Sequence, residues 1–417
     1  MKIIVVGCGI HYRSKYHSVL EKQGITIALA IDLKAQEETI EAFFSKRSLK
    51  PQHYLFLDES YRNHITVEEI EGFVSSIDLS GVDAVLIATE PKPRKAYALW
   101  AAHRKLDLFM DKPITAFSSP DRMDTLLSDF EEIERAVNDS GIRAVVSCER
   151  RTNIGYQWLH QYIRALNLPL TSIDIHFAGG VWKTETEYTE DENHPFFCGY
   201  GILLHSGYHF IDLLVTLLNL NGTLHKSLRV MASGPSGEVD FMMIGQGTRE
   251  GRVATHFSLK LFGTSVSARV QKESTPKLKG RLRQESVILH FGHLCSIHVR
   301  SHPFQKLWPE VNSIEDFSIT VMHSPLLSDR KRILTITRSD LSEMYEQLPL
   351  STSMNTFARQ FQLTEFLAGR DGNSSLASHR ETVAMLQEIY SLLKQTFPHK
   401  DTWSTDEKLM EETPKCV

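Results

Sequence analysis

Apolar and polar positions alternate in a regular order through the first part of the chain. Continuous apolar runs, rich in Ile, Val and Leu, are typical of strands that are covered on both faces of a sheet. They occupy residues 2–7, 25–32, 82–89 and 106–110. Segments with helical spacing of apolar residues follow them, at residues 15–24, 35–48, 67–77 and 95–105. This order predicts βαβ units and a parallel sheet. The connection 33–80 is long for one crossover, so we expect additional helix or loop within it.

The pattern changes beyond residue 150. A helix and a strand are predicted within 121–150, and helices are predicted at 156–166 and 202–219. Between 226 and 338 several runs alternate apolar and polar residues, which predicts an antiparallel sheet with one solvated face. Helical spacing returns at 356–369 and 380–397. The polar, acidic stretch 183–200 is predicted to be a loop, and 398–417 a flexible tail.

Composition narrows the class of protein. The 417 residues are 41% hydrophobic and 23% charged, with a formal net charge of −5. We therefore expect two domains with sizeable cores and no nucleic-acid partner. No apolar run approaches the roughly 18 residues of a membrane span, so no membrane partner is expected. The five cysteines are scattered without a CxxC pair, which fits a reducing compartment and a cytoplasmic protein.

A short glycine motif follows the first predicted strand. Gly7 and Gly9 stand where a dinucleotide fold needs a tight turn and a close approach to pyrophosphate. The third small residue of the usual motif would fall at Tyr12, which leaves a displaced helix start open. Asp32 ends the second strand, where an acid accepts hydrogen bonds from ribose hydroxyls and repels a 2′-phosphate. These features predict a Rossmann domain over 1–120, completed by 121–150, and favour NAD over NADP. Asp32 as a simple helix cap is the alternative.

Lys112 ends the strand at 106–110 and is followed at once by Pro113. Strands of an open parallel sheet direct their carboxyl ends toward the ligand crevice. Proline disfavours helix at the residue before it, so Lys112 is expected to stay extended at the strand end. A lysine there donates to a substrate oxygen, or loses its proton when desolvated. An exposed lysine with no catalytic role is the alternative.

At this point the chain resembles the glucose–fructose oxidoreductase/inositol dehydrogenase family. That family carries Glu-Lys-Pro where this chain has Asp111-Lys112-Pro113. Similar segments are "VDAVLIATEP", "CERRTNIGYQWL", "GYGILLHSGYHFIDLL" and "SLASHRETVAMLQEIYSLL", so the resemblance extends through nearly the whole chain. It implies a Rossmann domain followed, over 151–397, by an α/β domain with a predominantly antiparallel open sheet.

The resemblance also implies site residues. It places the cofactor against Gly7, Gly9, Ile10, His11, Asp32, Thr89, Pro91, Asp111 and Lys112. It gives Arg150, Arg151, Tyr156 and Asp212 as candidates for contact with a small-molecule substrate. Relatives often carry a histidine near the position of Arg94. This arginine is expected either to contact a phosphate or carboxylate or to lie solvated at a helix start.

His205, His209 and Asp212 recur at spacings of i, i+4 and i+7, which places them on one face of a helix. The resemblance maps the family's catalytic histidine to His209, with Asp212 in an orienting or capping role. His205 stands where relatives often have Asp and is expected to assist. A metal pair is an alternative, although no Glu follows His205 and Gly207 interrupts the helix. For these two reasons no metal is predicted. Packed core histidines are another alternative.

The expected activity is NAD-linked oxidation of a secondary alcohol on a sugar, cyclitol or similar polyol. His209 would be the acid/base, because imidazole exchanges protons near neutral pH, and Lys112 would polarise the same oxygen. Two alternatives stay open: transient use of bound NAD for elimination or epimerisation, and a catalytically inactive sensor on the same scaffold. The family often pairs copies through its C-terminal sheet, so a homo-oligomer is expected.

Overall fold

The computed structural model describes residues 1–117, 124–179, 203–232, 240–262, 283–302, 316–327, 332–345 and 353–396. The predicted acidic loop 183–200 and the predicted tail 398–417 lie outside these residues. Across the described ranges, no helix combines the length and the apolar character that crossing a membrane requires.

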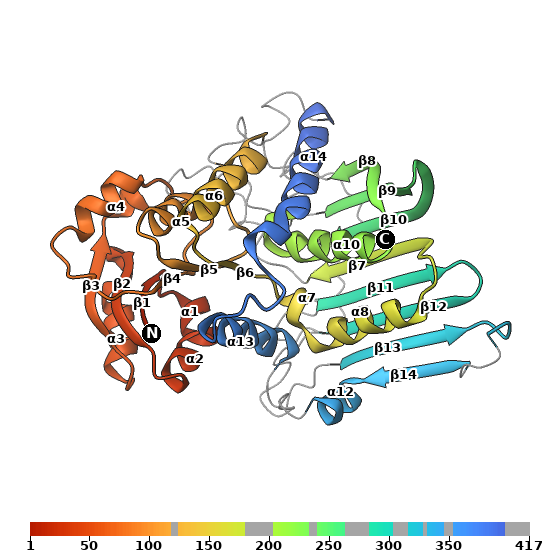
Figure 1. The fold of residues 1–417 in the computed structure, drawn as a ribbon, viewed down its shortest axis with the longest axis horizontal. Helices are drawn as coiled ribbons and strands as arrows, with labels where there is room; N and C mark the ends of the chain where they lie inside the picture. Colours follow the sequence, from red (N-terminus) through yellow and green to blue (C-terminus); the bar gives the residue numbers. More distant parts are fainter. Residues whose placement is uncertain are drawn as a thin grey trace, which may run out of the picture.

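A parallel sheet of the N-terminal residues confirms the predicted Rossmann fold (Figure 1). Its strand order is β3-β2-β1-β4-β5-β6, and the direction of strand succession reverses between β1 and β4, where such folds bind their ligand. The strands are β1 (Lys2–Val6), β2 (Thr26–Leu33), β3 (Pro51–Leu57), β4 (Ala84–Ile87), β5 (Asp107–Asp111) and β6 (Ala144–Ser147). The helices are α1 (Ile10–Lys15), α2 (His17–Lys22), α3 (Glu37–Ser45), α4 (Val67–Val74), α5 (Arg94–His103) and α6 (Leu126–Ser140).

The continuous apolar runs have a direct structural cause. On β1, Ile3 and Val5 point into a core shared with α1, α2 and α3, while Ile4 and Val6 point into a core on the opposite face. Successive side chains of a strand alternate between faces, so a strand covered on both faces needs apolar residues at every position. All four side chains are buried.

Strand β3 is the element that the sequence pattern missed. The predicted connection 33–80 contains α3 and α4 as expected, but also a strand that pairs in parallel with β2. β3 lies at the edge of the sheet and begins with Pro51, a position at which proline costs no ladder hydrogen bond. Its side chains are only partly buried in the middle of the strand, so it has no continuous apolar run.

The second sheet has the order β14-β13-β12-β11-β7-β10-β9-β8. Its neighbouring strands are antiparallel except for β7 and β10, which confirms the predicted predominantly antiparallel sheet. The strands are β7 (Ser172–Gly179), β8 (Leu224–Ala232), β9 (Asp240–Arg249), β10 (Arg252–Phe262), β11 (Arg283–Phe291), β12 (Cys295–His302), β13 (Asp316–His323) and β14 (Ile333–Thr337).

Helices cover one face of this sheet (Figure 1). They include α8 (Ile154–Leu166) and α10 (Tyr208–Leu220), which lie side by side, while the short α12 (Arg338–Met344) packs by β13 and β14. The other face is more exposed. In β12, Ile297 and Val299 are buried, whereas Arg300, which follows Val299 and points to the opposite face, is exposed. Contact between copies of the chain through this face stays a prediction.

The last helices return to the Rossmann sheet. In α13 (Met354–Leu367), Leu363 and Phe366 belong to the apolar core beside α1 and α2, and the Phe366 ring lies 5.5 Å from that of Phe109. The helix α14 (Arg380–Thr396) packs against both α6 and α10. Residues far apart in the sequence therefore complete the walls around the carboxyl ends of the parallel strands.

Gly7 ends β1 in a conformation that only glycine adopts easily. Its φ is +84°, and its backbone N–H donates to the Ile31 carbonyl at 2.9 Å. A Cβ there would lie 2.4 Å from the Thr89 backbone nitrogen. Gly9 differs, because its φ is −64° and a Cβ would meet nothing within 4 Å.

We therefore expect Gly7→Ala to lower the free energy of unfolding by about 2–4 kcal/mol, through left-handed backbone strain and the collision with the end of β4. The matched control, Gly9→Ala, should change it by less than about 1 kcal/mol. Urea denaturation of both variants measures this difference. Equal stability of the two variants would contradict the close packing of the Gly7 turn.

Candidate active site

A cleft of about 670 Å³ lies at the carboxyl ends of the parallel strands, where the two sheets meet. Residues next to both sheets and from α13 line it, which is the arrangement expected for a cofactor and a substrate side by side. The predicted residues that it brings together are Gly7, Gly9, Ile10, His11, Asp32, Thr89, Pro91, Asp111, Lys112, Arg150 and His209.

Asp32 holds the glycine turn at one end of the cleft. Its carboxylate accepts from the backbone N–H of Cys8 at 2.6 Å and from that of Leu33 at 2.7 Å. Burial raises the pKa of Asp32 above its usual value, and these two hydrogen bonds oppose that rise. Because each carboxylate oxygen accepts only one backbone hydrogen bond, each keeps a lone pair for a further donor.

Tyr12 does not close the cleft. Its side chain is fully buried below the turn, where its hydroxyl lies 3.1 Å from His17 Nδ1 and its ring packs near Phe44. The helix breaks soon afterwards, at Tyr16, so the helix predicted over 15–24 is divided between α1 and α2. The Tyr16 hydroxyl donates to Asp111 and lies 3.1 Å from Ser147 Oγ. The tyrosine at position 12 and the helix break at Tyr16 therefore both place tyrosine side chains in the buried core.

The expectation that Arg94 lies solvated is wrong, while its contact with a phosphate or carboxylate stays a prediction, since it lines the cleft. The guanidinium is buried and donates to three backbone carbonyls: Asp111 at 2.7 Å, Pro113 at 2.6 Å and Thr89 at 2.6 Å. These bonds tie the ends of β4 and β5 together. Arg94 thereby fixes the backbone on both sides of Lys112, whose peptide bond to Pro113 is cis. A sequence without its fold gives no sign that an arginine at a helix start turns inward.

Lys112 lies in the cleft beside several cations. Burial lowers the pKa of its ammonium group to about 7, and the charge of Arg359 adds to that effect. Glu149 and Asp111 act in the opposite direction. A lysine with this pKa exchanges protons near neutral pH, which an exposed lysine does not.

His209 lies in the first turn of α10, with one ring nitrogen in contact with the thiol of Cys148. Cys148 Sγ donates to Asp212 Oδ2 at 3.3 Å and lies 3.4 Å from His209 Nδ1. With the thiol proton directed to Asp212, the sulfur accepts from Nδ1–H, and the imidazole keeps its lone pair on Nε2. Burial lowers the pKa of His209 well below its usual value, and the charge of Lys112 adds to this. The ring is therefore neutral and able to accept a proton.

Four further charged residues form the floor of the cleft. Arg150 donates to both Glu149 and Glu285, while Arg359 lies 2.6 Å from the other oxygen of Glu149. Arg150 also lies over the Phe210 ring, 4.4 Å from its centroid. Sequence reasoning found only Arg150. Glu149 stands beside it in the quoted motif, but Glu285 on β11 and Arg359 on α13 carry no local signal.

Three predicted substrate contacts lie outside the lining of the cleft. Arg151 and Asp212 form an ion pair at 2.6 Å, and Thr382 donates to the same carboxylate at 2.9 Å. Tyr156 is buried against Phe317. This geometry does not support direct substrate contact for any of the three. Asp212 instead accepts from Cys148, which lies beside His209, and its orienting role stays a prediction.

The histidine segment is not one regular helix. Leu203–Gly207 forms a π-helical turn, and α10 begins only at Tyr208. His205 lies in that turn, and its side chain is outside the described part of the chain. In the same described part, no group of three or more His, Cys, Asp or Glu side chains is arranged to hold a metal ion.

Comparison with known proteins gives matches of structure only. No model of a protein family and no curated protein matches the chain. Solved structures do. A levoglucosan dehydrogenase in complex with NADH and L-sorbose is 14% identical, with a TM-score of 0.63, over 95% of this chain and 97% of the other. The WlbA dehydrogenase of Bordetella pertussis, in complex with NADH and UDP-GlcNAcA, is 14% identical, with a TM-score of 0.61, over 95% and 96%. A dehydrogenase of Chromobacterium violaceum is 13% identical, with a TM-score of 0.61, over 95% and 97%.

The chain shares the fold of these structures. Because the similarity covers nearly the whole length of each protein, it confirms the two-sheet architecture that the motifs implied. At these identities it concerns the fold, and the chemistry must be argued from the residues of the cleft.

The lowered pKa of Lys112 can be measured directly. Lysine Nζ NMR should give a pKa of about 7 for Lys112, against the ordinary 10.5. In Glu149→Gln the pKa should fall further, because the variant removes a negative charge that favours the ammonium form. The control is Glu71→Gln, which removes a carboxylate of α4 that is paired with Arg104 and should leave the pKa of Lys112 unchanged. A Lys112 pKa near 10.5 would contradict the desolvated environment.

Proposed function

We propose that this protein is an NAD-dependent oxidoreductase that acts on a secondary alcohol of a sugar, cyclitol or similar polyol. The observation that carries the proposal is the meeting of Lys112 and the neutral His209 in one cleft with the glycine turn and Asp32. Dehydrogenases with the same fold, solved with NADH and sugar-like molecules, add support.

The residues of the turn fit a dinucleotide. Gly9 leaves open space where a side chain would stand, and the lone pairs of Asp32 are available to ribose hydroxyls. Arg62, the lining arginine near Asp32, is already paired with Glu59 at 2.5 Å and Glu90 at 3.5 Å. It is therefore a poor partner for a 2′-phosphate, and the site favours NAD over NADP.

A nicotinamide held here would supply, at its C4, the acceptor for the hydride that leaves the carbinol carbon of the substrate. His209 Nε2 accepts the hydroxyl proton, while Nδ1–H stays directed to Cys148. Lys112 donates a hydrogen bond to the same oxygen and stabilises the negative charge that develops on it. As the carbon–oxygen bond becomes a carbonyl, the proton remains on His209. The reverse reaction returns it.

The candidates for holding the substrate are the charged side chains of Arg150, Glu285 and Arg359. The polar side chains of Asn355 and Thr356, in the first turn of α13, also line the cleft. Arg150 and Arg359 are fixed by carboxylates, so they offer donors in constant positions rather than mobile charges. The identity of the polyol is a matter for a substrate screen.

Removal of the lysine tests the catalytic assignment. We expect Lys112→Met to lower turnover by about 10²–10⁴, since an acid–base group is worth that much, while NAD binding changes only a few-fold. The matched control is Lys95→Met, because Lys95 pairs with Asp129 and Glu132 on the surface and should leave turnover unchanged. NADH absorbance in a polyol screen and NAD calorimetry give the two readouts. Full turnover in Lys112→Met would remove Lys112 from the mechanism.

Cofactor choice provides an independent test. Calorimetry should give NAD at least about tenfold tighter binding than NADP, since the Asp32 carboxylate repels the additional phosphate. Asp32→Asn removes that charge and should lower the ratio of the NAD affinity to the NADP affinity. Asp58 caps a short helix nearby in the sequence, and Asp58→Asn should leave this ratio unchanged. Binding of neither nucleotide would contradict the proposed function and favour a ligand sensor on this scaffold.

A further inference from the structure

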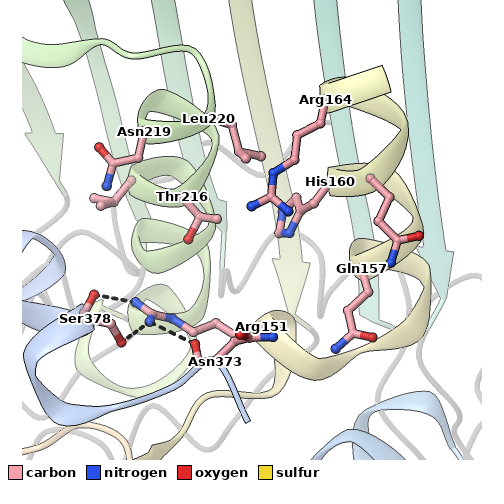
Figure 2. A pocket seen from close by; sticks show the side chains of 11 residues that line it. Arg151, Gln157, His160, Arg164, Thr216, Asn219, Leu220, Asn373 and Ser378 are labelled. Carbon is pink, nitrogen blue, oxygen red and sulfur yellow. Dashed lines mark hydrogen bonds between the residues drawn. The ribbon is translucent and has the colours of Figure 1, made fainter. Parts of the chain in front are cut away.

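A second cavity, of about 500 Å³, lies between α8 and α10 and shares no lining residue with the cleft. Figure 2 shows side chains of both helices directed into it, with the segment around Asn373 and Ser378 closing one end. Its size is within the range of sites for small molecules. The proposed dehydrogenase activity gives this cavity no role.

Arg164 is the lining residue whose positive charge is available to a ligand in the cavity. Arg164 lines the cavity from α8 and makes no ion pair within the described residues. Arg151 differs, because its guanidinium donates to both Asp212 oxygens, to the Asn373 carbonyl, and to Ser378. These bonds occupy its five N–H groups, so Arg151 forms a fixed wall of the cavity rather than a free donor.

His160 contributes a second polar group next to Arg164 (Figure 2). Its Nε2 is buried and has no hydrogen-bond partner in the structure described. An unpaired buried polar atom is costly, and such atoms usually mark a place where a ligand or water binds. Burial lowers the pKa of His160 to about 4, with the charge of Arg164 as the next cause, and a bound anion would reverse part of that effect.

The rest of the lining is neutral and rich in hydrogen-bonding groups. Gln157, Gln161 and Thr216 offer amides and a hydroxyl, and no Asp or Glu side chain is among the residues that line the cavity. Such groups match the hydroxyls of a polar small molecule, while a solvent-exposed arginine that forms no ion pair in the described residues matches a carboxylate or phosphate.

We propose that the cavity between α8 and α10 binds a small hydroxylated molecule through one carboxylate or phosphate group, which Arg164 and His160 contact. The proposal does not depend on the dehydrogenase activity. Arg151 connects the two sites, because the same guanidinium that borders this cavity holds Asp212, which accepts from Cys148, and Cys148 lies beside His209. Two residues, Asp212 and Cys148, therefore lie between the wall of this cavity and the imidazole of His209.

The experiment uses the full chain with isotope-labelled histidine, and the His160 signal is identified by its loss in His160→Gln. Inorganic phosphate and gluconate are titrated separately at constant ionic strength, so that the two anion classes are distinguished. We expect a saturable shift of the His160 signal with at least one probe, and a His160 pKa above about 4 in the bound state.

Arg164→Gln should weaken that binding at least about tenfold, the effect expected from loss of a charge-assisted hydrogen bond. Arg135→Gln, which removes an exposed arginine of α6 that does not line the cavity, should bind as the wild type does. The proposal is overturned if neither probe gives a saturable shift, or if Arg164→Gln binds as tightly as Arg135→Gln.

Discussion

A buried charge network joins the two sheets at the base of the cleft. Glu149 follows the last strand of the parallel sheet and accepts from Arg150 and Arg359, and Arg150 also reaches Glu285 on the second sheet. Glu149, Arg150 and Glu285 are almost fully removed from water and Arg359 is partly buried, so each charge depends on its partners. Loss of one partner would leave an uncompensated charge, at a cost of about 3–5 kcal/mol. The relative position of the two sheets, and of α13, is thus fixed at the point where Lys112 and His209 meet.

The same network sets the protonation of the two central residues. Burial is the first cause of the lowered pKa of both Lys112 and His209. Arg359 adds to it at both residues and Arg150 at His209, while Glu149 opposes it at Lys112. Behind the histidine, Cys148 occupies the position between imidazole and carboxylate. A thiol is a weaker hydrogen-bonding group than a carboxylate, so it orients the ring without raising its pKa. The site therefore combines a neutral base with a lysine poised near neutral pH.

Local sequence signals predicted those parts of this arrangement that depend on local structure. The apolar runs gave the parallel strands because both faces are covered, and Gly7 and Lys112 were recognisable because each ends such a strand. The edge strand β3 was missed since partial exposure removes the continuous apolar run. The burial of Arg94 was not predicted, because its partners are backbone carbonyls at the ends of β4 and β5. Glu285 and Arg359 enter the cleft from distant segments, and only the three-dimensional fold brings them there.

The central claim is that Lys112 and His209 face the reactive end of a bound nicotinamide. A crystal structure of the protein with NAD measures this directly. The account predicts adenosine ribose hydroxyls on the Asp32 carboxylate, pyrophosphate at the Gly7–Gly9 turn, and nicotinamide C4 beside Lys112 Nζ and His209 Nε2. A cleft that stays empty at saturating NAD, or a nicotinamide bound away from both side chains, would contradict it.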